Sequence, residues 1–359
     1  MEAVILVGGE GTRLRPLTYH IHKTMAPVLN EPFLEHMIYY LKEYGVDDII
    51  LALCYLPQSI KDYFGDGSRF GVKLTYVLED SPLGTAGAVK NAERYLQGTF
   101  LVFNGDVFTG IDLGAMLSFH RERGAKATIA LTPVEDPSAY GVVETDAQGR
   151  AWRFVEKPPR EEATTNLINA GIYILDEEVL QEIPPDTFYM FEHHVFPGLL
   201  EKEMPVYGYP SDEYWIDMGT PEKYLELHRD LLRENNPSVF CSQIKQKKAQ
   251  VAIHPSAVIE GDVVIGEGCT IGPEVHIKGP SVIGEGCIIF DQANIEGSIL
   301  WSNVRIGQRA VLKDCIIGDN SVIGDDTIIP QGVVIGGNIL INEGSRLEPD
   351  AKIGPETEI

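Results

Sequence analysis

The second half of the chain repeats an aliphatic residue at every sixth position. The repeat runs without a miss through Ile253, Ile259, Ile265, Ile271, Ile277, Ile283, Ile289 and Ile295, shifts by one to Leu300, Ile306 and Leu312, and shifts again to Ile317, Ile323, Ile329, Ile335, Ile341, Leu347, Ile353 and Ile359. A period of six is neither helical nor a simple alternation, and it predicts a parallel β-helix whose triangular coil has three six-residue sides. The aliphatic residue would point into the coil, and the glycine that often follows it would permit the corner.

This pattern resembles the hexapeptide-repeat left-handed β-helix family over residues 251–359. Cys269 and Cys287 lie 18 positions apart, one full coil, so we expect them to stack in one interior column as packing residues. The chain's five cysteines are odd in number and form no CxxC pair, which indicates neither a zinc site nor a disulfide framework.

The first half alternates short apolar runs with amphipathic segments. Strands are expected at residues 3–7, 48–54, 73–77 and 99–103, and helices at 32–45 and 84–98, ended by Gly45 and Gly98. Such alternation predicts a Rossmann-like α/β domain with a mostly parallel sheet, and ligands at the carboxyl ends of the strands.

The two periodicities divide the chain into an α/β domain over residues 1–232 and the β-helix over residues 251–359. The stretch between them, residues 233–250, is polar, contains one proline and carries the basic cluster 245–248. We interpret it as a linker.

Composition narrows the possible partners. The formal net charge of −24 argues against a nucleic-acid surface, because phosphate backbones are bound by basic stripes. No apolar run reaches the length of a membrane span, and no signal peptide is evident, so we expect a cytoplasmic protein without a membrane partner. An acidic protein can still bind a small anion with a few placed cations, backbone N–H groups and a divalent metal.

Residues 8–23, "GGEGTRLRPLTYHIHK", follow the first expected strand and combine a glycine-rich turn with cations. The spacing fits neither the P-loop nor the dinucleotide fingerprint, which would need a third glycine at Leu14. The remaining interpretation is a turn whose N–H groups face phosphate oxygens, with Arg13 and Lys23 as mobile cations.

Together with an ordered set of further motifs, this stretch resembles the sugar-1-phosphate nucleotidylyltransferases. The motifs are "EDSPLGTAGAV" (79–89), "NGD" (104–106), "YGVV" (140–143), "VEKP" (155–158), "NAGIY" (169–173) and "WIDMGTPEKY" (215–224). The resemblance is nearest to the mannose-1-phosphate guanylyltransferases that carry a hexapeptide-repeat tail. It implies that a sugar 1-phosphate oxygen attacks the α-phosphorus of a nucleoside triphosphate and releases pyrophosphate, without a protein nucleophile.

The resemblance also implies roles for individual residues. Asp106 and Asp217 would hold Mg²⁺, Arg13 would grip the departing phosphates, and Lys23 would contact the α-phosphate. The residues implied for the nucleotide are Gly8, Gly9, Gly11, Thr12, Arg13, Glu79, Gly84, Thr85 and Asp106. The residues implied for the sugar phosphate are Tyr140, Gly141, Glu156, Lys157, Asn169 and Gly171, with Lys157 on the phosphate and Glu156 and Asn169 on hydroxyl groups.

Glu79 bears on the choice of base. Thymidylyl and uridylyl relatives tend to have glutamine here, whose amide both donates and accepts, whereas a carboxylate only accepts. Guanine offers N1–H and the N2 amino group side by side, and thymine and uracil offer a single N3–H between two carbonyls. Glu79 therefore favours GTP.

One position departs from the family pattern, because His22 stands where proline usually precedes the lysine. This change would loosen the approach of Lys23, and we expect His20 and His22 at the surface or the pocket rim rather than as a metal pair.

Three alternatives compete with guanylyl transfer. The chain could be a thymidylyl- or uridylyltransferase for glucose 1-phosphate, or a regulatory or scaffold protein that keeps the fold without catalysis. The β-helix could also be an acyltransferase with His254 or His276 as base, although the repeat has no long insertion beside them. We expect instead that the β-helix or the catalytic domain forms a homo-oligomer.

Overall fold

The structure is a computed structural model that describes residues 1–233 and 250–355. The chain forms two compact units, Met1–Gly9 with Met37–Asp217 and Glu10–His36 with Met218–Ile359. The predicted linker, 233–250, lies almost entirely outside the described residues. The domain boundaries at 232 and 251 stay a prediction.

The first unit is built on a mixed nine-stranded sheet. Its strands are β1 (Glu2–Val7), β4 (Asp48–Leu53), β5 (Lys73–Leu78), β6 (Thr99–Asn104), β8 (Ala127–Pro133), β9 (Gly141–Thr145), β10 (Ala151–Glu156), β11 (Leu167–Asp176) and β12 (Val206–Pro210). The four strands predicted from apolar runs are β1, β4, β5 and β6, and they pair in parallel in the order β5-β4-β1-β6. The long strand β11 pairs antiparallel with β6 and β8, and β12 pairs parallel with β8.

Helices accompany the sheet of the first unit. They are α1 (Phe33–Glu43), which begins in the second unit, α2 (Pro57–Phe64), α3 (Gly84–Asn91), α4 (Leu113–Arg123) and α5 (Phe196–Glu201). The helix expected over 84–98 is shorter, because α3 ends at Asn91 and only a 3-10 turn, Glu93–Tyr95, follows. Among residues 1–233 and 250–355, no helix is long and apolar enough to cross a bilayer.

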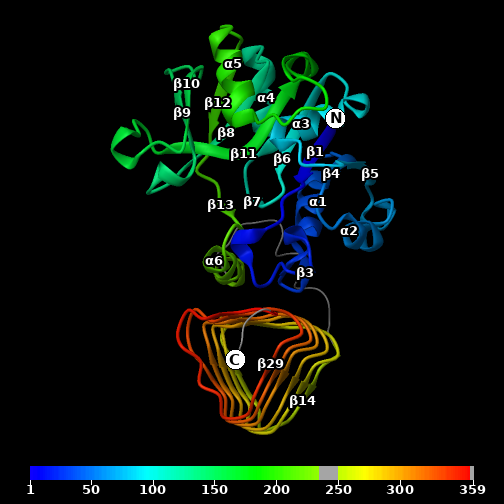
Figure 1. Cartoon of the computed structure of the whole chain (residues 1–359), viewed down its shortest axis with the longest axis vertical. Helices are drawn as coiled ribbons and strands as arrows, with labels where there is room; N and C mark the ends of the chain where they lie inside the picture. The colour runs from blue at the N-terminus through cyan, green and yellow to red at the C-terminus, as the bar shows by residue number, and fades with distance from the viewer. Residues whose placement is uncertain (234–249, 356–359) are drawn as a thin grey trace. The chain divides into compact units, whose positions relative to one another are not determined.

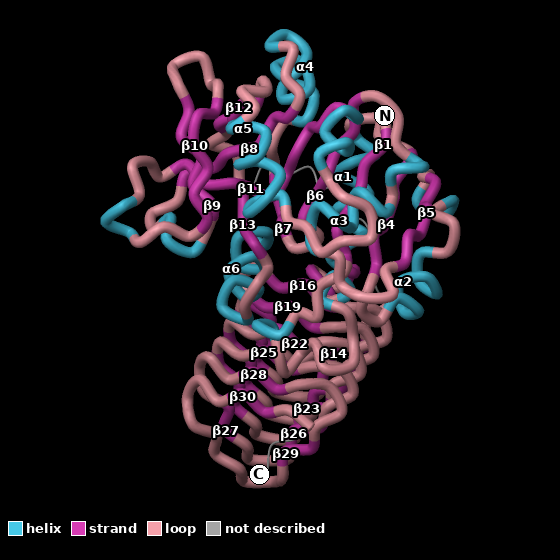
Figure 2. Tube along the Cα trace, turned by 45° about the horizontal axis from the view of Figure 1, so that its top comes forward, coloured by secondary structure: helices cyan, strands magenta, loops and turns pink. Residues whose placement is uncertain are grey.

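The second unit contains the β-helix, a left-handed parallel coil whose triangular cross-section is visible in Figure 1 and whose stacked coils run as a ladder in Figure 2. Its strands are β14 (Ala252–Ile253), β15 (Val258–Glu260), β16 (Val263–Ile265), β17 (Thr270–Ile271), β18 (His276–Lys278), β19 (Ser281–Ile283), β20 (Ile288–Ile289), β21 (Asn294–Glu296), β22 (Ile299–Leu300), β23 (Arg305–Ile306), β24 (Val311–Lys313), β25 (Ile316–Ile317), β26 (Val322–Ile323), β27 (Ile328–Ile329), β28 (Val334–Ile335), β29 (Leu340–Ile341) and β30 (Lys352–Ile353). They form three parallel sheets, which start at β14, β15 and β16.

The six-residue repeat predicts the interior columns correctly. In the first sheet Ile253, Ile271, Ile289, Ile306, Ile323 and Ile341 are successive register partners. Cys269 and Cys287 are both buried and precede the register pair Thr270–Ile288, so they stack as predicted. Their thiols donate to the carbonyl oxygens of Gly284 and Trp301 at 3.0 and 3.1 Å.

The glycines that follow the interior aliphatic residues were predicted to permit the corners of the coil, but the structure gives a different reason for them. A Cβ on Gly284 would lie 2.4 Å from the carbonyl carbon of Trp301 on the next coil, so glycine is needed there for close backbone approach. The left-handed backbone of the corners falls two positions later, for example at Gly286 (φ 67°) and Asn320 (φ 58°). Asparagine adopts this region more readily than most residues.

The third sheet of the β-helix, β16-β19-β22-β25-β28-β30, differs from the other two on its outer side. On its four middle strands the outward residues, Val282, Ile299, Ile316 and Val334, are aliphatic and at most 2% exposed. Partners for this face come from elsewhere in the second unit, from residues 16–30 and from α6 (Pro221–Leu232). Because apolar surface is removed from water on both sides of this sheet, the β-helix shares a core with those segments.

Hydrogen bonds reinforce the packing on the third face. Trp301 Nε1 donates to Tyr224 Oη on α6 at 2.9 Å, and Tyr224 in turn donates to the carbonyl oxygen of Pro27. Asn30 Nδ2 donates to the carbonyl oxygen of Ile283 at 2.9 Å. A Cβ on Gly354 would lie 2.9 Å from the ring of Tyr19, so the chain also approaches closely there.

Candidate active site

The carboxyl ends of four adjacent parallel strands in the first unit form one polar edge. Gly8 follows β1, Cys54 follows β4, Glu79 follows β5 and Asp106 lies two residues after β6. The register aligns these ends, because Val7 is opposite Leu53 and Leu53 is opposite Leu78. Ligands of open α/β sheets bind outside such strand ends. The structure therefore brings together one group of predicted residues from separate parts of the sequence.

Glu79 is half-buried at this edge and has a defined orientation. Its Oε2 accepts a hydrogen bond from the backbone N–H of Leu83 at 2.8 Å. Its Oε1 lies beside Gly8, 3.6 Å from where a Cβ on that glycine would be. Burial raises the pKa of the Glu79 carboxyl, and the Leu83 N–H partly opposes the rise. Glu79 is thus a fixed acceptor rather than a freely solvated surface acid.

The start of α3, which contains Gly84 and Thr85, packs tightly against residues 187–191. Gly84 has φ 73°, and a Cβ there would lie 2.6 Å from the carbonyl oxygen of Tyr189. That same oxygen accepts from the N–H groups of Ala86 and Gly87, both at 3.0 Å. The Thr85 hydroxyl accepts from the N–H of Phe191 at 2.9 Å. The glycines of this motif are therefore required by neighbouring backbone.

Asp106 and Asp217 are brought close by a small ladder between β7 (Val107–Thr109) and β13 (Trp215–Asp217). Asp217 is the register partner of Val107, the residue after Asp106. The Tyr140 hydroxyl donates to Asp217 Oδ1 at 3.1 Å and so orients this carboxylate. Two carboxylates at a strand end match the hard oxygen ligands that Mg²⁺ prefers, with substrate phosphates and water completing the shell.

Within the described ranges, no group of three or more His, Cys, Asp or Glu side chains could hold a metal ion. A cation at Asp106 and Asp217 would thus have at most two protein carboxylates, as is usual for Mg²⁺ bound with a phosphate substrate. The donor set fits such a cation.

Gly141, Glu156 and Lys157 lie together at the paired strands β9 and β10. Gly141 is opposite Glu156, and a Cβ on Gly141 would lie 2.8 Å from Glu156 Oε2. Lys157 N donates to the carbonyl oxygen of Tyr140 at 3.0 Å, and its Nζ lies 3.4 Å from Glu156 Oε1. Lys157 has φ 47°, a left-handed conformation that is uncommon for lysine and that clusters at functional sites.

Asn169 and Gly171 lie in the middle of β11, where its pairing with β8 shifts in register. Asn169 Oδ1 accepts from Gly171 N at 2.9 Å, and Gly171 has φ 73° with a missing Cβ only 2.6 Å from Asn104 Nδ2. Asn104 Oδ1 is buried and has no hydrogen-bond partner among the described residues. Asn104, from the "NGD" motif, therefore adds a buried acceptor on the side chain that lies beside Gly171.

The remaining predicted residues, Gly11, Thr12, Arg13 and Lys23, belong to the second unit. A tight loop holds them, in which Thr18 Oγ1 donates to the carbonyl oxygen of Gly11 at 2.8 Å. Gly11 has φ 65°, and a Cβ there would lie 2.9 Å from Lys23 Cβ, so glycine is required where the lysine crosses the turn. Arg13 is exposed in the 3-10 turn Thr12–Leu14.

The expectation that both histidines lie at the surface or rim is wrong for His22. His20 is exposed, but the side chain of His22 is 1% exposed and caps the 3-10 turn Lys23–Met25. Its Nδ1 accepts from Thr24 N at 3.2 Å and lies 2.9 Å from Thr24 Oγ1. Its backbone, at φ −68° and ψ 143°, is one that proline also adopts, so the substitution keeps the path of the chain into Lys23.

Two buried residues that the sequence did not predict contact the predicted site residues. Glu192 lies in the π-helical turn η8 (Phe191–Val195) and accepts from the Thr85 hydroxyl, and the hydroxyl of Tyr173 on β11 accepts from Asn169 Nδ2. Tyr173 belongs to the quoted "NAGIY" motif, which could have pointed to it. No motif surrounds Glu192.

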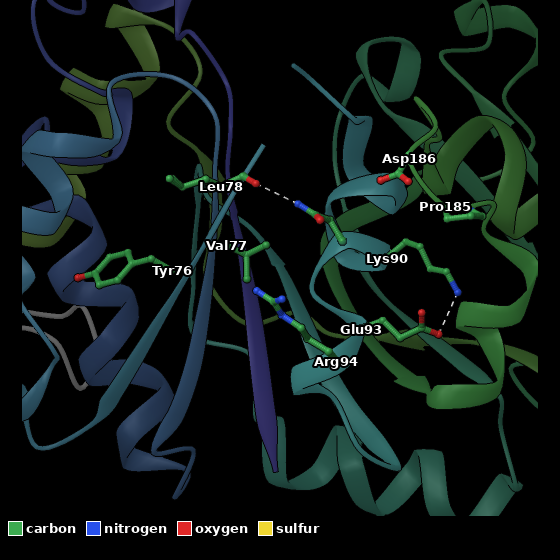
Figure 3. A pocket seen from close by; sticks show the side chains of 9 residues that line it. Tyr76, Val77, Leu78, Lys90, Glu93, Arg94, Pro185 and Asp186 are labelled. Atoms are coloured by element: carbon green, nitrogen blue, oxygen red, sulfur yellow. Dashed lines mark hydrogen bonds and ion pairs between the residues drawn. The ribbon is translucent and has the colours of Figure 1, made fainter. Parts of the chain in front are cut away.

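A separate cavity of about 510 Å³ opens beside β5 and α3 (Figure 3). It is lined by Tyr76, Val77, Leu78, Lys90, Asn91, Glu93, Arg94, Pro185 and Asp186. Two interactions join lining residues: Lys90 Nζ lies 2.9 Å from Glu93 Oε1, and Asn91 Nδ2 donates to the carbonyl oxygen of Leu78 at 3.1 Å. None of the predicted site residues lines it.

A Rossmann-like sheet with acidic residues at its parallel strand ends, followed by a left-handed β-helix, defines an enzyme of the nucleotide-transferring class. Residues 2–234 match the family model described as nucleotidyl transferase, and residues 243–347 match the model of the EIF2B subunit epsilon LbH domain. The chain belongs to the nucleotidyl transferase family. The predicted enzyme class and both parts of the predicted fold are thereby confirmed.

Relatives carry related activities. A mannose-1-phosphate guanylyltransferase of Mycobacterium tuberculosis is 41% identical over 278 residues, which cover 76% of this chain and 77% of the relative. A UTP–glucose-1-phosphate uridylyltransferase of Synechocystis is 36% identical, covering 74% of each chain. The crystal structure of HddC from Yersinia pseudotuberculosis complexed with GMP-PN is 32% identical with a TM-score of 0.55, covering 63% of this chain and 97% of HddC.

Proposed function

We propose that the chain transfers a guanylyl group from GTP to a hexose 1-phosphate, mannose 1-phosphate in particular, with Mg²⁺, and that it releases a GDP-sugar and pyrophosphate. The observation on which the proposal rests is the fixed carboxylate of Glu79, held by Leu83 N at the end of β5. A carboxylate accepts from guanine N1–H and N2–H together and would face the carbonyl groups of a pyrimidine. The guanylyltransferase relative and the GMP-PN complex of HddC support the same base.

The reaction needs no protein nucleophile. An oxygen of the sugar phosphate attacks the α-phosphorus, a new P–O bond forms, and the bond from the α-phosphorus to the bridging oxygen of pyrophosphate breaks. Since two anions must meet, alignment and charge neutralisation supply most of the catalysis. We assign Arg13 to the departing pyrophosphate and Lys23 to the α-phosphate, with N–H groups of Gly8, Gly9, Gly11 and Thr12 on the remaining oxygens.

Asp106 and Asp217 are the residues that would hold Mg²⁺. When bound, the cation would neutralise phosphate charge and act as a Lewis acid at the phosphoryl oxygens. Tyr140 orients the Asp217 carboxylate through its hydroxyl group.

On the sugar side we assign Lys157 to the phosphate of the sugar, and Glu156 and Asn169 to sugar hydroxyl groups. Gly141 and Gly171 lack side chains beside Glu156 and Asn104, which leaves backbone close to this region. The stereochemistry at C2 distinguishes mannose from glucose, and the mannose assignment follows the guanylyltransferase relative.

The deciding experiment measures pyrophosphate release with Mg²⁺ for GTP, dTTP, UTP, ATP and CTP, each with mannose 1-phosphate and with glucose 1-phosphate. We expect the highest kcat/KM for GTP with mannose 1-phosphate. A maximum for UTP with glucose 1-phosphate would favour the second candidate, which the Synechocystis relative supports. If no pair of substrates releases pyrophosphate, the result would favour the alternative of a scaffold protein without catalysis.

We further propose that the chain assembles into a homo-oligomer through its β-helix or its catalytic domain. Light scattering coupled to size-exclusion chromatography tests this directly, and a mass near 39.7 kDa, that of one chain, would contradict it.

A further inference from the structure

Glu192 is a buried acid to which the proposed reaction assigns no role. It is 9% exposed, and it lies in the π-helical turn η8, remote in sequence from every motif of the site. Burial raises the pKa of its carboxyl, and hydrogen bonds, including that from Thr85, oppose the rise. A carboxyl group in such a place needs compensating donors, because an unsatisfied buried acid is costly. Its donors identify what it does.

The first donor comes from the nucleotide side. The Thr85 hydroxyl, on the first turn of α3, donates to Glu192 Oε2 at 2.9 Å. The same hydroxyl accepts from Phe191 N at 2.9 Å, so both hydrogen-bonding directions of Thr85 are used inside the protein. Thr85 therefore fixes the start of α3 to the turn that contains Glu192, and the segment leading from Glu79 into α3 is fixed with it.

The second donor comes from the sugar side. The hydroxyl of Tyr173, a fully buried residue of β11, donates to Glu192 Oε1 at 3.4 Å. That hydroxyl accepts from Asn169 Nδ2 at 2.9 Å, while Asn169 Oδ1 accepts from Gly171 N. Both polar atoms of the Asn169 amide are thus hydrogen-bonded, and Nδ2 is connected to Glu192 through the Tyr173 hydroxyl.

We propose that Glu192 is a positioning residue, which fixes the nucleotide-side start of α3 through Thr85 and the sugar-side Asn169 through Tyr173. This inference rests on the proposed function in so far as α3 serves the nucleotide and Asn169 the sugar. Glu192 touches neither substrate. Glu192 connects the nucleotide half-site, at the start of α3, and the sugar half-site, at Asn169, to one buried carboxyl group. The two substrates are thereby held in one relative orientation.

The directions of the two hydrogen bonds explain why an acidic residue occupies position 192. Two hydroxyl groups donate to Glu192, one to each carboxylate oxygen, and a carboxylate accepts both. Glutamine replaces it in part, because its carbonyl oxygen accepts from one hydroxyl and its NH₂ can donate to a second lone pair of the other. Alanine leaves both hydroxyls without this partner in a buried place.

The test compares the KM for each substrate in four variants of the full chain. Losing one such hydrogen bond should raise the affected KM about 10-fold. We expect Glu192→Ala to raise the KM of both nucleotide and sugar phosphate, Thr85→Ala that of the nucleotide alone, and Tyr173→Phe that of the sugar phosphate alone. Glu192→Gln should be less impaired than Glu192→Ala, because it keeps an acceptor for one hydroxyl and a partner for the other. Glu201→Ala, which removes an exposed acid at the end of α5, is the matched control.

Any other pattern overturns the proposal. If Glu192→Ala changes only one KM, or lowers kcat without changing either, or if Glu192→Gln is as impaired as Glu192→Ala, then Glu192 does not connect the half-sites. Should Glu192→Ala fail to fold, Thr85→Ala and Tyr173→Phe still decide. If the hydrogen-bond network had no role in binding, Thr85→Ala would not change only the KM for the nucleotide, and Tyr173→Phe would not change only the KM for the sugar phosphate.

The KM values are measured with the pair of substrates that the wild-type chain uses best, so an error in base or sugar leaves this test intact. A wild-type chain inert with every pair would refute the proposed activity. The same pattern would then be sought in dissociation constants for GTP and mannose 1-phosphate, measured calorimetrically.

Discussion

Replacing Glu79 with glutamine tests the basis of the proposed nucleotide choice. The carboxylate has one oxygen on Leu83 N at 2.8 Å and the other beside Gly8. Glutamine keeps the Leu83 bond only if its carbonyl oxygen turns toward that N–H, which places the amide NH₂ where Oε1 lies. The base-facing group then changes from an acceptor to a donor, and guanine N1–H and N2–H would meet another donor.

The size of the effect follows from the group that is lost. A hydrogen bond to a charged group contributes about 1.5–3 kcal/mol. At 1.4 kcal/mol for each factor of ten, kcat/KM for GTP should fall roughly 10- to 150-fold. UTP should lose less, because the NH₂ group that then faces the base can donate to a carbonyl of uracil, so the ratio of kcat/KM for GTP to that for UTP should fall.

The assay is initial-rate pyrophosphate release at matched sugar-phosphate concentration, with GTP and UTP compared in each variant. Asp80→Asn is the matched control, since it makes the same change of charge on the adjacent, exposed residue. A GTP-to-UTP ratio that is unchanged in Glu79→Gln would refute the assignment of Glu79 to the base. A ratio that falls equally in Asp80→Asn would attribute the effect to net charge alone.

Three further predictions concern other parts of the site. Because burial raises the pKa of Glu79 and guanine needs the carboxylate, kcat/KM for GTP should decline as pH falls through a value above that of an exposed glutamate, and pH profiles of Glu79→Gln should lack this decline. Tyr140→Phe removes the donor that orients Asp217, so the Mg²⁺ concentration for half-maximal activity should rise about 10-fold or more, and an unchanged Mg²⁺ titration would contradict this. His22→Ala removes the cap on Thr24 N and should lower the free energy of unfolding by about 1 kcal/mol, whereas His22→Asn should recover most of it in denaturant unfolding.

Much of the architecture could be read from the chain because its determinants are local. A six-residue period fixes which side chains face the interior of a coil, so the column from Ile253 to Ile341 required no knowledge of the rest of the fold. Polar residues just beyond the ends of apolar strands, such as Glu79 and Asp106, were also predictable, since parallel strands end at one edge.

The parts that escaped prediction depend on contacts between remote segments. Glu192 lies 107 positions from Thr85, and nothing in the turn around it indicates that two hydroxyls converge there. His22 looked like a surface residue because its cap is visible only once Thr24 has folded back on it. The grouping of residues 10–36 with the C-terminal half follows from long-range packing alone.

The sequence does contain a sign that the third sheet of the β-helix is covered on its outer side. In the third sheet, β30 has Lys352 before its interior aliphatic residue, but the four strands before β30 have an aliphatic residue there, Val282, Ile299, Ile316 and Val334. An alternating strand with one solvated face would place polar residues there. Their burial shows that this sheet is covered on both sides.

The packing of residues 16–30 on the third sheet of the β-helix determines the order in which parts of the protein can fold during translation. Residues 10–36 are among the first to leave the ribosome, and the β-helix residues on which they pack, from Ile283 to Gly354, are among the last. The loop that contains Arg13 and Lys23 therefore waits for the end of translation to complete its packing. A chain interrupted before its final coils would contain every strand of the first unit's sheet, but it would lack part of the β-helix surface that residues 16–30 contact.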